Sequence, residues 1–232
     1  MLTIEVTPER YSNVTPPRGV FDLRLPASRI CAILDSPESW GHGQEAANLV
    51  RVRLESQWRS LSSLDPDRAS RDLASAVAEL PEALVEADWG CSFSAAILFI
   101  SGDAVSFLAA GALRIVVFTP SETVELFRPD TLADQLVEHG QITREEATTH
   151  PYRAVLIGQF VDPSSPHISV SGPFRLPQES LLVVAPCPMI EAVQGLPYSN
   201  LCRLNGEAFQ DHVFSQGVFR GAVIFGHHSA AT

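Results

Sequence analysis

The sequence predicts an α+β protein in which two stacked antiparallel sheets are flanked by helices. Three observations support this fold class: short apolar runs typical of strands recur along the chain, two consecutive segments between residues 43 and 87 have helical periodicity, and shorter helical segments separate the later strands. The chain has 232 residues, of which 45% are apolar and 19% charged. Because a chain of this size buries one substantial core, we expect a single domain over residues 1–232.

The N-terminal third is predicted to contain three strands followed by two helices. Leu2–Val6 has the alternation of a strand, and Val20–Leu25 and Arg29–Leu34 have the pattern of a hairpin. Over residues 43–61 the apolar side chains recur every three or four positions, which is the spacing of an amphipathic helix. A second helix is predicted over residues 65–87. We expect the two helices to form an antiparallel pair on one outer face.

The rest of the chain is predicted to alternate strands with short helices. Four apolar runs separated by Ser, Gly, Asp and Pro predict one antiparallel meander: Cys91–Ile100, Ala104–Ala110, Leu113–Phe118 and Thr123–Phe127. Short helices are expected at Leu132–His139, Thr143–His150, Met189–Gln194 and Ala208–Phe214. Further strands are expected at Ala154–Ile157, His167–Ser171, Ser180–Ala185 and Val218–Phe225.

Charge and composition exclude several function classes. Sixteen basic residues against 27 acidic ones give a net charge of −11, which repels nucleic acid and anionic membrane surfaces. Every basic residue is Arg, so a Schiff-base lysine and a phosphate-loop lysine are excluded. The four cysteines are widely spaced and no apolar run is long enough to span a bilayer, so we expect a reduced, cytoplasmic protein.

Several motifs resemble one family in order along nearly the whole chain. Arg128–Arg153 reads RPDTLADQLVEHGQITREEATTHPYR. It is similar to the flap of the bacterial metal-dependent Ser/Thr protein phosphatases of type 2C, where DHS…L…G.IT.EEA..HP.R is usual. Gly111–Arg114 lies where the family has GDSR, Leu181–Pro188 where it has LLLCSDGL, and Gly217–Phe225 where it has GG.DN.TVVV. The resemblance implies an αββα sandwich with a metal cleft between the two sheets.

The resemblance also implies that most of the family's metal ligands are lost. Family members hold two Mg²⁺ or Mn²⁺ ions largely with aspartates, which supply the hard oxygen ligands that these ions prefer. Asp35 matches the family's ADG aspartate, but Ala112, Pro186 and Phe219 stand where GDSR, SDG and DN carry theirs. Asp22 is the candidate for the N-terminal NED aspartate. The chain is therefore predicted to be a pseudophosphatase with at most two remnant ligands.

The expected function is a protein-binding or regulatory module in Ser/Thr phosphorylation signalling, with a Ser/Thr kinase or a phosphoprotein as partner. No cofactor is expected. The alternative is a weak metal-dependent Ser/Thr phosphatase that uses Mg²⁺ or Mn²⁺ at a reduced site around Asp35 and Asp22. Arg18 is a candidate phosphate ligand, or simply an exposed loop arginine. The candidate partner contacts lie in the flap: Leu132, Leu136, Glu138, Arg144 and His150.

Other chemically suggestive residues are better explained by structure. Cys187 with His150, His212 or His42 could form a nucleophile and base, but free cysteines are more often small apolar residues of the interior. Glu145 and Glu146 follow Thr143 at the start of a predicted helix, where a capping box and the helix dipole favour carboxylates. Arg114 is expected to pair with a carboxylate near the end of the sheet.

Overall fold

The computed structural model describes residues 2–7, 20–24, 28–35, 94–157, 169–216 and 223–229, with short helical pieces at 48, 51–53 and 55–56. These pieces lie in the first of the two long helices predicted from the sequence. The remainder of that helix, the whole of the second, and the way the two pair lie outside the described residues.

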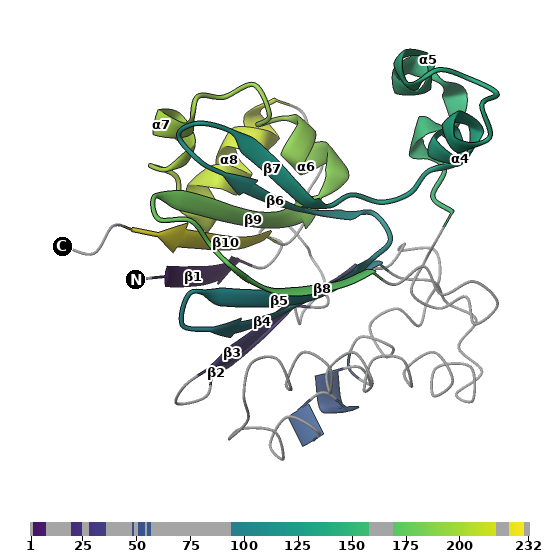
Figure 1. Ribbon diagram of the computed structural model, residues 1–232. Coiled ribbons are helices and arrows are strands. Elements are labelled where there is room, and N and C mark those ends of the chain that lie inside the picture. The colour runs from purple at the N-terminus through teal and green to yellow at the C-terminus, as the bar shows by residue number, and fades with distance from the viewer. Residues whose placement is uncertain are drawn as a thin grey trace.

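Two five-stranded antiparallel sheets form the body of the protein, as predicted (Figure 1). Sheet A has the order β1 (Leu2–Thr7), β10 (Val223–His228), β9 (Ser180–Pro186), β6 (Leu113–Phe118) and β7 (Thr123–Phe127). Sheet B has the order β2 (Val20–Arg24), β3 (Arg29–Asp35), β4 (Ser94–Ser101), β5 (Ala104–Ala110) and β8 (Ser169–Arg175). The predicted hairpin is confirmed by the pairing of β2 with β3.

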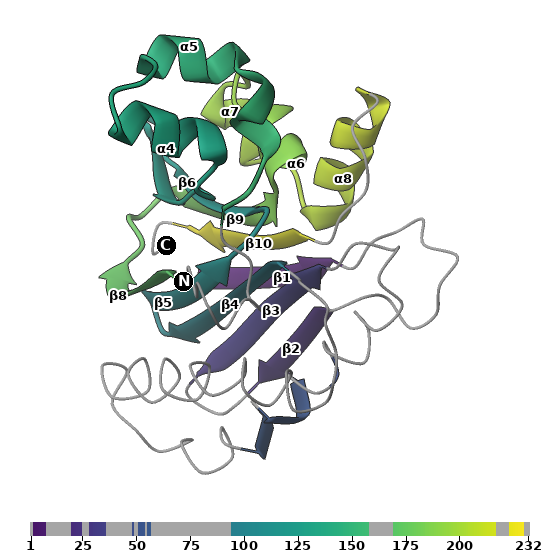
Figure 2. The ribbon, with the colours of Figure 1, turned by 90° about the vertical axis from the view of Figure 1, so that its right-hand side faces the viewer.

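The main core lies between the sheets, and a second core lies on the outer face of sheet A. Alternate residues of β6 and β9 contribute to different cores: Ile115 and Leu182 to the first, Val116 and Val183 to the second. Because both faces of these strands are buried, their sequences are continuous apolar runs rather than alternating ones. In the described part of the chain, three helices cover this outer face of sheet A (Figure 2): α6 (Cys187–Glu191), α7 (Tyr198–Leu201) and α8 (Gly206–Ser215).

Two of these helices were predicted, with different bounds, and α7 was not. The segment expected at Met189–Gln194 begins two residues earlier as α6, and that expected at Ala208–Phe214 is α8. Asn205 caps α8 by accepting a hydrogen bond from the backbone of Ala208. A four-residue helix such as α7 contains too little periodicity to detect in a sequence. No helix in the described residues is long and apolar enough to cross a membrane.

The expected meander of four strands is wrong in one respect, because its halves belong to different sheets. β4 and β5 form a hairpin in sheet B, whereas β6 and β7 form one in sheet A. The chain changes sheet at Gly111, whose φ of +77° is unfavourable for residues with a side chain. The four apolar runs were correct as strands, but the short Gly-Ala connection was mistaken for an ordinary hairpin turn.

The strand predicted at Ala154–Ile157 is also wrong. Pro151–Ala154 forms the 3₁₀ helix η2, and Leu156 makes only an isolated bridge with Thr131. Pro151 occupies the first position of the helix, where its missing N–H costs nothing, so it was the sequence signal for a short helix at this place. The two flap helices are confirmed as α4 (Leu132–Glu138) and α5 (Arg144–Thr149).

Candidate functional site

One end of the sandwich, here called the cleft end, gathers three of the positions aligned with the family's metal ligands. Asp35 at the end of β3 pairs in register with Ser94 at the start of β4. Ala112 lies in the connection from β5 to β6, and Leu113 pairs in register with Pro186 at the end of β9. These positions are 77 to 151 residues apart from Asp35 in sequence, yet the two sheets bring them to the same end.

Hydrogen bonds join these segments directly to one another. The backbone N–H of Ala112 donates to the hydroxyl oxygen of Ser94 at 2.8 Å. The carbonyl oxygen of Ala112 accepts from the backbone N–H of Cys187 at 3.0 Å and from its thiol at 3.1 Å. Both polar groups of the Ala112 backbone are thus satisfied within the protein. The β5–β6 connection is fixed between β4 on one side and the start of α6 on the other.

The described side chains of this end do not fit a binuclear metal site. Ala112 has no side-chain oxygen, and neither has Pro186. Among the residues the structure describes, no group of three or more His, Cys, Asp and Glu side chains is placed to hold a metal ion. Two divalent cations held near one another need several anionic oxygen ligands to offset their repulsion. Phe219, the third replaced position, lies outside the described residues.

Asp22 is not brought to Asp35. The register of β2 and β3 places Asp22 opposite Cys31, and Asp35 lies four residues further along β3. At about 3.3 Å per residue, the two backbones are roughly 13 Å apart along the strand. Ions that share bridging ligands lie only about 4 Å apart. The two aspartates therefore do not form one remnant site.

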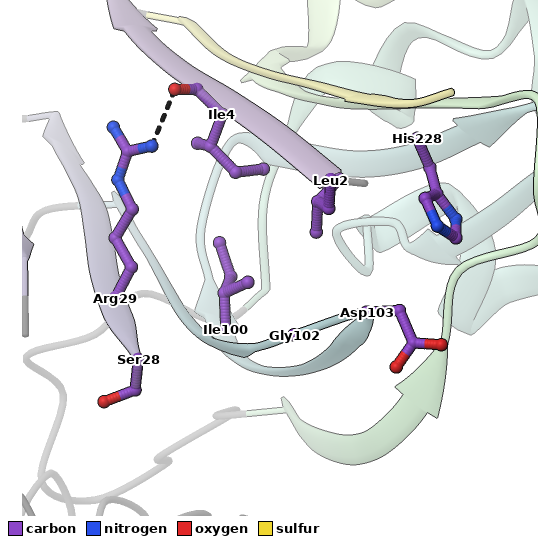
Figure 3. Close-up of a pocket in the computed structure, with 8 residues that line it drawn as sticks. All are labelled: Leu2, Ile4, Ser28, Arg29, Ile100, Gly102, Asp103 and His228. Carbon is purple, nitrogen blue, oxygen red and sulfur yellow. Dashed lines mark hydrogen bonds between the residues drawn. The ribbon is translucent and has the colours of Figure 1, made fainter. Parts of the chain in front are cut away.

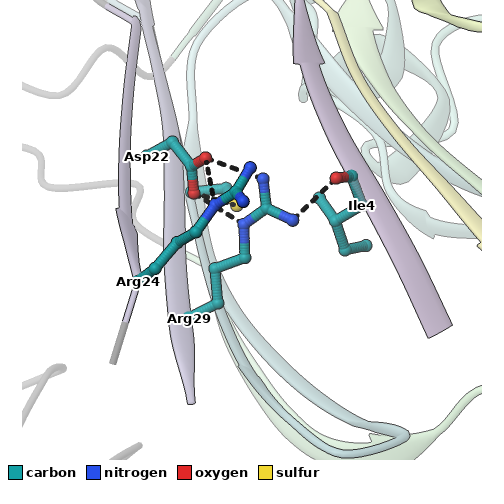
Figure 4. A network of polar contacts seen from close by, with 5 residues as sticks. Ile4, Asp22, Arg24 and Arg29 are labelled. Carbon is teal, nitrogen blue, oxygen red and sulfur yellow. Dashed lines mark hydrogen bonds and ion pairs between the residues drawn. The ribbon is translucent and has the colours of Figure 1, made fainter. Parts of the chain in front are cut away.

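Asp22 is instead part of an ion-pair network (Figure 4). Arg29 donates to both of its carboxylate oxygens, from Nε at 2.6 Å and from Nη2 at 2.7 Å, and Arg24 donates from Nε at 3.2 Å. Burial alone would raise the pKa of Asp22, but the hydrogen bonds and charge of Arg29, with a smaller contribution from Arg24, hold that pKa below its ordinary value. The carboxylate is ionised and committed to these two arginines, and its Oδ1 also accepts from the Cys31 thiol at 3.8 Å.

The Cys187 thiol is not set up as a nucleophile. Burial raises its pKa from 9.0 to about 11, and the nearby charge of Arg114 offsets only part of this increase. His150 and His212, the candidate bases, lie in the flap and in α8, where they contact Tyr152 and Gln216 respectively. At neutral pH the sulfur is a protonated hydrogen-bond donor to a backbone carbonyl.

Cys187 is therefore expected to react slowly with alkylating reagents at neutral pH. A thiol with a pKa near 11 has about a hundredfold less thiolate at pH 7 than one with a pKa of 9.0, and the thiolate is the reactive form. Iodoacetamide labelling followed by peptide mass spectrometry over pH 7–10 measures the rate at Cys187. Labelling of Cys202 in the same samples controls for reagent activity. Rapid modification of Cys187 at pH 7 would contradict the assignment.

Arg114 is paired with a carboxylate, as predicted. Its Nε and Nη2 both donate to Oε1 of Glu125, which lies on the neighbouring strand β7. The arginine is only 7% exposed. Arg114, which is aligned with the arginine of the family's GDSR pattern, thus links two strands of sheet A. It is not available for a phosphate.

The flap is a compact unit whose two ends meet. The backbone N–H of Leu132 donates to the carbonyl of Val155 at 2.8 Å, and that of Ile157 donates to Asp130 at 3.1 Å. Figure 1 shows α4 and α5 projecting away from both sheets. Thr143 and Glu146 form the predicted capping box, and a second box joins Thr131 to Asp134 at the start of α4.

The five candidate partner contacts separate into inner and outer groups. Leu132 and Leu136 are half-buried, as expected for residues that pack inward, whereas Glu138 and Arg144 are exposed. His150 is half-buried, accepts a hydrogen bond from the backbone of Tyr152 at 3.2 Å and contacts its ring. Arg18, the candidate phosphate ligand, lies outside the described residues.

Two exposed apolar side chains of the flap were missed by the sequence analysis. Tyr152 is 47% exposed and Val155 is 46% exposed, and both lie in or just after η2. The wrong assignment of Ala154–Ile157 to a strand placed Val155 within a sheet. The available signal was Pro151, which favours the start of a short helix. Both side chains therefore add exposed apolar surface to the flap.

Solved structures of the same architecture were found by comparison. The serine/threonine phosphatase of S. agalactiae superposes with a TM-score of 0.78 at 17% sequence identity, covering 98% of this chain and 99% of that one. The chain has the fold of the bacterial type 2C Ser/Thr phosphatases. Stp1 from Staphylococcus aureus gives a TM-score of 0.73 at 15% identity, over 99% and 95% of the two chains.

One further structure of this fold was solved with its metal ions bound. The catalytic domain of PstP, described in complex with 2 manganese ions, superposes with a TM-score of 0.61 at 13% identity, over 99% of this chain and 100% of that one. The sequence of the present chain matches no protein-family model and no curated protein. At these identities the superpositions establish the fold alone, so the chemistry depends on the residues at the cleft end.

Proposed function

We propose that this chain is a catalytically inactive, phosphatase-like domain that acts as a protein-binding or regulatory module in Ser/Thr phosphorylation signalling. One observation carries the proposal: the positions aligned with the family's GDSR and SDG aspartates are Ala112 and Pro186, and hydrogen bonds link their segments directly. The type 2C fold is retained, whereas the residues aligned with its metal-binding aspartates are replaced. The proposal includes the absence of a metal cofactor and a cytoplasmic location.

The retained flap supports a role in binding. Each of its two helices begins with a capping box, and the ends of the flap are joined by backbone hydrogen bonds. Exposed apolar side chains at Tyr152 and Val155 lie close in sequence to the outward-facing Arg144. Partly exposed apolar groups beside charged ones are typical of interaction surfaces. The partner we propose is a Ser/Thr kinase or a phosphoprotein.

The first test is metal binding and turnover. We expect calorimetric titration with Mn²⁺ or Mg²⁺ to show no tight site, and a phosphothreonine peptide to release no phosphate above the buffer rate. The physical reason is the shortage of anionic oxygens, since among Asp35, Ala112, Pro186 and Phe219 only the first has a carboxylate in its side chain. The S. agalactiae phosphatase, assayed in parallel, serves as the positive control.

Two tight sites, or metal-dependent turnover that disappears in Asp35→Ala, would overturn the proposal. That outcome would support the alternative, a weak Ser/Thr phosphatase with a reduced metal site. The converse experiment restores the aligned metal ligands in one variant, which combines Ala112→Asp, Pro186→Asp, Cys187→Gly and Phe219→Asp. It is expected to gain Mn²⁺ affinity relative to the wild-type chain, with at most partial recovery of activity, because Ser36 replaces the glycine of the family's ADG turn.

A further inference from the structure

Strand β7 leaves one edge of sheet A open. It is the outermost strand of the sheet, on the side away from β1, and among the described strands it pairs only with β6 (Figure 1). Thr123 and Glu125 are exposed, and Val124 between them is 38% exposed. A strand at the edge of a sheet has backbone N–H and C=O groups that another strand can bond. The β7 edge is therefore a candidate interaction surface.

The hairpin geometry shows which backbone groups of β7 face outward. The backbone N–H of Thr119 donates to the carbonyl of Glu122 at 2.8 Å, so these two residues form a hydrogen-bonded pair at the turn. From there Thr123, Val124 and Glu125 follow in regular register with β6. Because hydrogen-bonded and non-hydrogen-bonded pairs alternate along an antiparallel ladder, Val124 bonds to β6, whereas Thr123 and Glu125 direct their N–H and C=O groups to the open edge. No described residue bonds to those outward groups.

Two other edges of the sandwich are protected against strand addition. β8 contains Pro173, which has no N–H, and its ladder with β5 is interrupted by a bulge. On β1, the carbonyl of Ile4 is already bonded by the Arg29 side chain at 2.6 Å (Figure 3). β7 contains no proline, and its bulge comes only after Glu125. The stretch of β7 before the bulge is thus regular and open.

The charges at this edge decide what kind of strand it accepts. Glu122 is exposed and forms no ion pair with a described residue, and Glu125 shares its carboxylate with Arg114. The chain as a whole carries a net charge of −11. Pairing of two copies through β7 would bring these acidic groups together, which is unfavourable for like charges on neighbouring strands. A basic strand is attracted instead.

We propose that the open edge of β7 binds an extended, basic segment of a partner protein as an additional antiparallel strand of sheet A. The backbone of the segment bonds to Thr123 and Glu125. An arginine or lysine of the segment lies against Glu122, and a β-branched side chain covers Val124. In recognition of this type the main-chain bonds supply affinity, and the side chains beside them supply specificity. The surface lies outside the flap, so it is separate from the one in the proposed function.

The test uses the peptide acetyl-Thr-Arg-Val-Thr-Arg-amide, titrated into the full chain and followed by amide NMR. We expect saturable shifts from Glu122 to Glu125 and slower amide exchange at Thr123 and Glu125. Replacing both arginines of the peptide by glutamate is expected to weaken binding at least fivefold. Absence of saturable shifts at β7, or equal affinity for the two peptides, would overturn the proposal.

N-methylated peptides separate strand addition from attraction by charge alone. In the antiparallel register the second and fourth residues of the peptide direct their N–H groups to β7, and the third directs its N–H away. Methylation of the second and fourth nitrogens is therefore expected to weaken binding at least fivefold. Methylation of the third is the matched control and should change the affinity by less than twofold. Equal affinity for both methylated peptides would contradict an added strand.

Substitutions in the chain test the same edge. Glu122→Arg is expected to weaken binding of the basic peptide three- to tenfold, whereas Glu191→Arg, which makes the same charge change on the exposed end of α6, should alter it by less than twofold. Thr123→Pro removes an outward N–H without removing a ladder bond, so it should fold and bind at least fivefold more weakly. Glu122→Arg decides the question even where Thr123→Pro does not fold, and unchanged affinity in it would contradict the site.

Light scattering of the free chain tests the competing occupant. We expect a monomer at all concentrations, because two copies repel one another at this edge. A concentration-dependent dimer that Thr123→Pro abolishes would assign the edge to a second copy and overturn the proposal. None of these measurements depends on metal binding or on the flap. Failure of the β7 site would therefore leave the proposed function intact, and the reverse holds.

Discussion

Gly111→Ala is expected to lower the free energy of unfolding by roughly 2–5 kcal/mol. An L-residue in the left-handed conformation costs about 1–2 kcal/mol, and Gly111 has a φ of +77°. A Cβ at this position would also lie 2.7 Å from the Cα of Ser94, which is backbone and cannot rotate away. Overpacking of this kind costs about 1–3 kcal/mol more. Chemical denaturation with a two-state fit measures the change.

Gly140→Ala is the matched control. Gly140 has a φ of +68°, yet a Cβ there would meet no atom within 4 Å. Only the conformational cost of about 1–2 kcal/mol applies to it. If the two variants lose equal stability, the close approach of Gly111 to Ser94 is not important. Gly111 thus directs the chain from sheet B to sheet A, and its lack of a side chain allows Ser94 to come close enough to accept a hydrogen bond from Ala112.

Most of the fold was predictable because burial leaves a clear pattern. The described strands matched predicted apolar runs to within a few residues, and Thr143–Glu146 identified the start of α5. The sheet to which a strand belongs was less predictable. An antiparallel hairpin and a change of sheet can use equally short connections, and the difference depends on a glycine conformation that the sequence does not reveal. Local signals also failed at η2, where an apolar segment resembled a strand.

The candidate site was predictable in its positions but not in its contacts. The motif resemblance placed Ala112 and Pro186 at equivalent positions, and the sheets bring them together. The hydrogen bonds of Ala112 with Ser94 and Cys187 join residues 18 and 75 positions away in sequence, which no local pattern indicates. Asp22 was matched to the family's NED aspartate by residue type alone, and residue type does not reveal which groups a side chain contacts. Its partner Arg29 lies on the adjacent strand, and the register of that hairpin decides which groups meet.

Arg29→Met is expected to lower the free energy of unfolding by about 1–3 kcal/mol at neutral pH, because hydrogen bonds to charged groups contribute about 1.5–3 kcal/mol. The Arg29 side chain is 17% exposed and that of Asp22 is 25% exposed, so water does not fully replace the lost partner. Arg29 also donates to the carbonyl oxygen of Ile4 at 2.6 Å. Because Ile4 lies on β1 of sheet A and Asp22 on β2 of sheet B, this one side chain links the two sheets (Figure 4).

The effect of Arg29→Met should depend on pH. Arg29 and Arg24 lower the pKa of Asp22 in the folded state, so the pair contributes fully above the ordinary aspartate pKa of 3.8. This contribution is lost as the pH falls through the lower, folded-state value, where Asp22 becomes protonated. The stability difference between the wild type and Arg29→Met should therefore be largest at pH 6–7 and shrink below about pH 4. Urea denaturation at a series of pH values measures it. Arg175→Met, which removes an exposed partner of Asp103, is the control and should leave stability nearly unchanged at every pH, because water screens an exposed ion pair. A pH-independent loss in Arg29→Met would show that Arg29 stabilises the sandwich through Ile4 and packing rather than through Asp22.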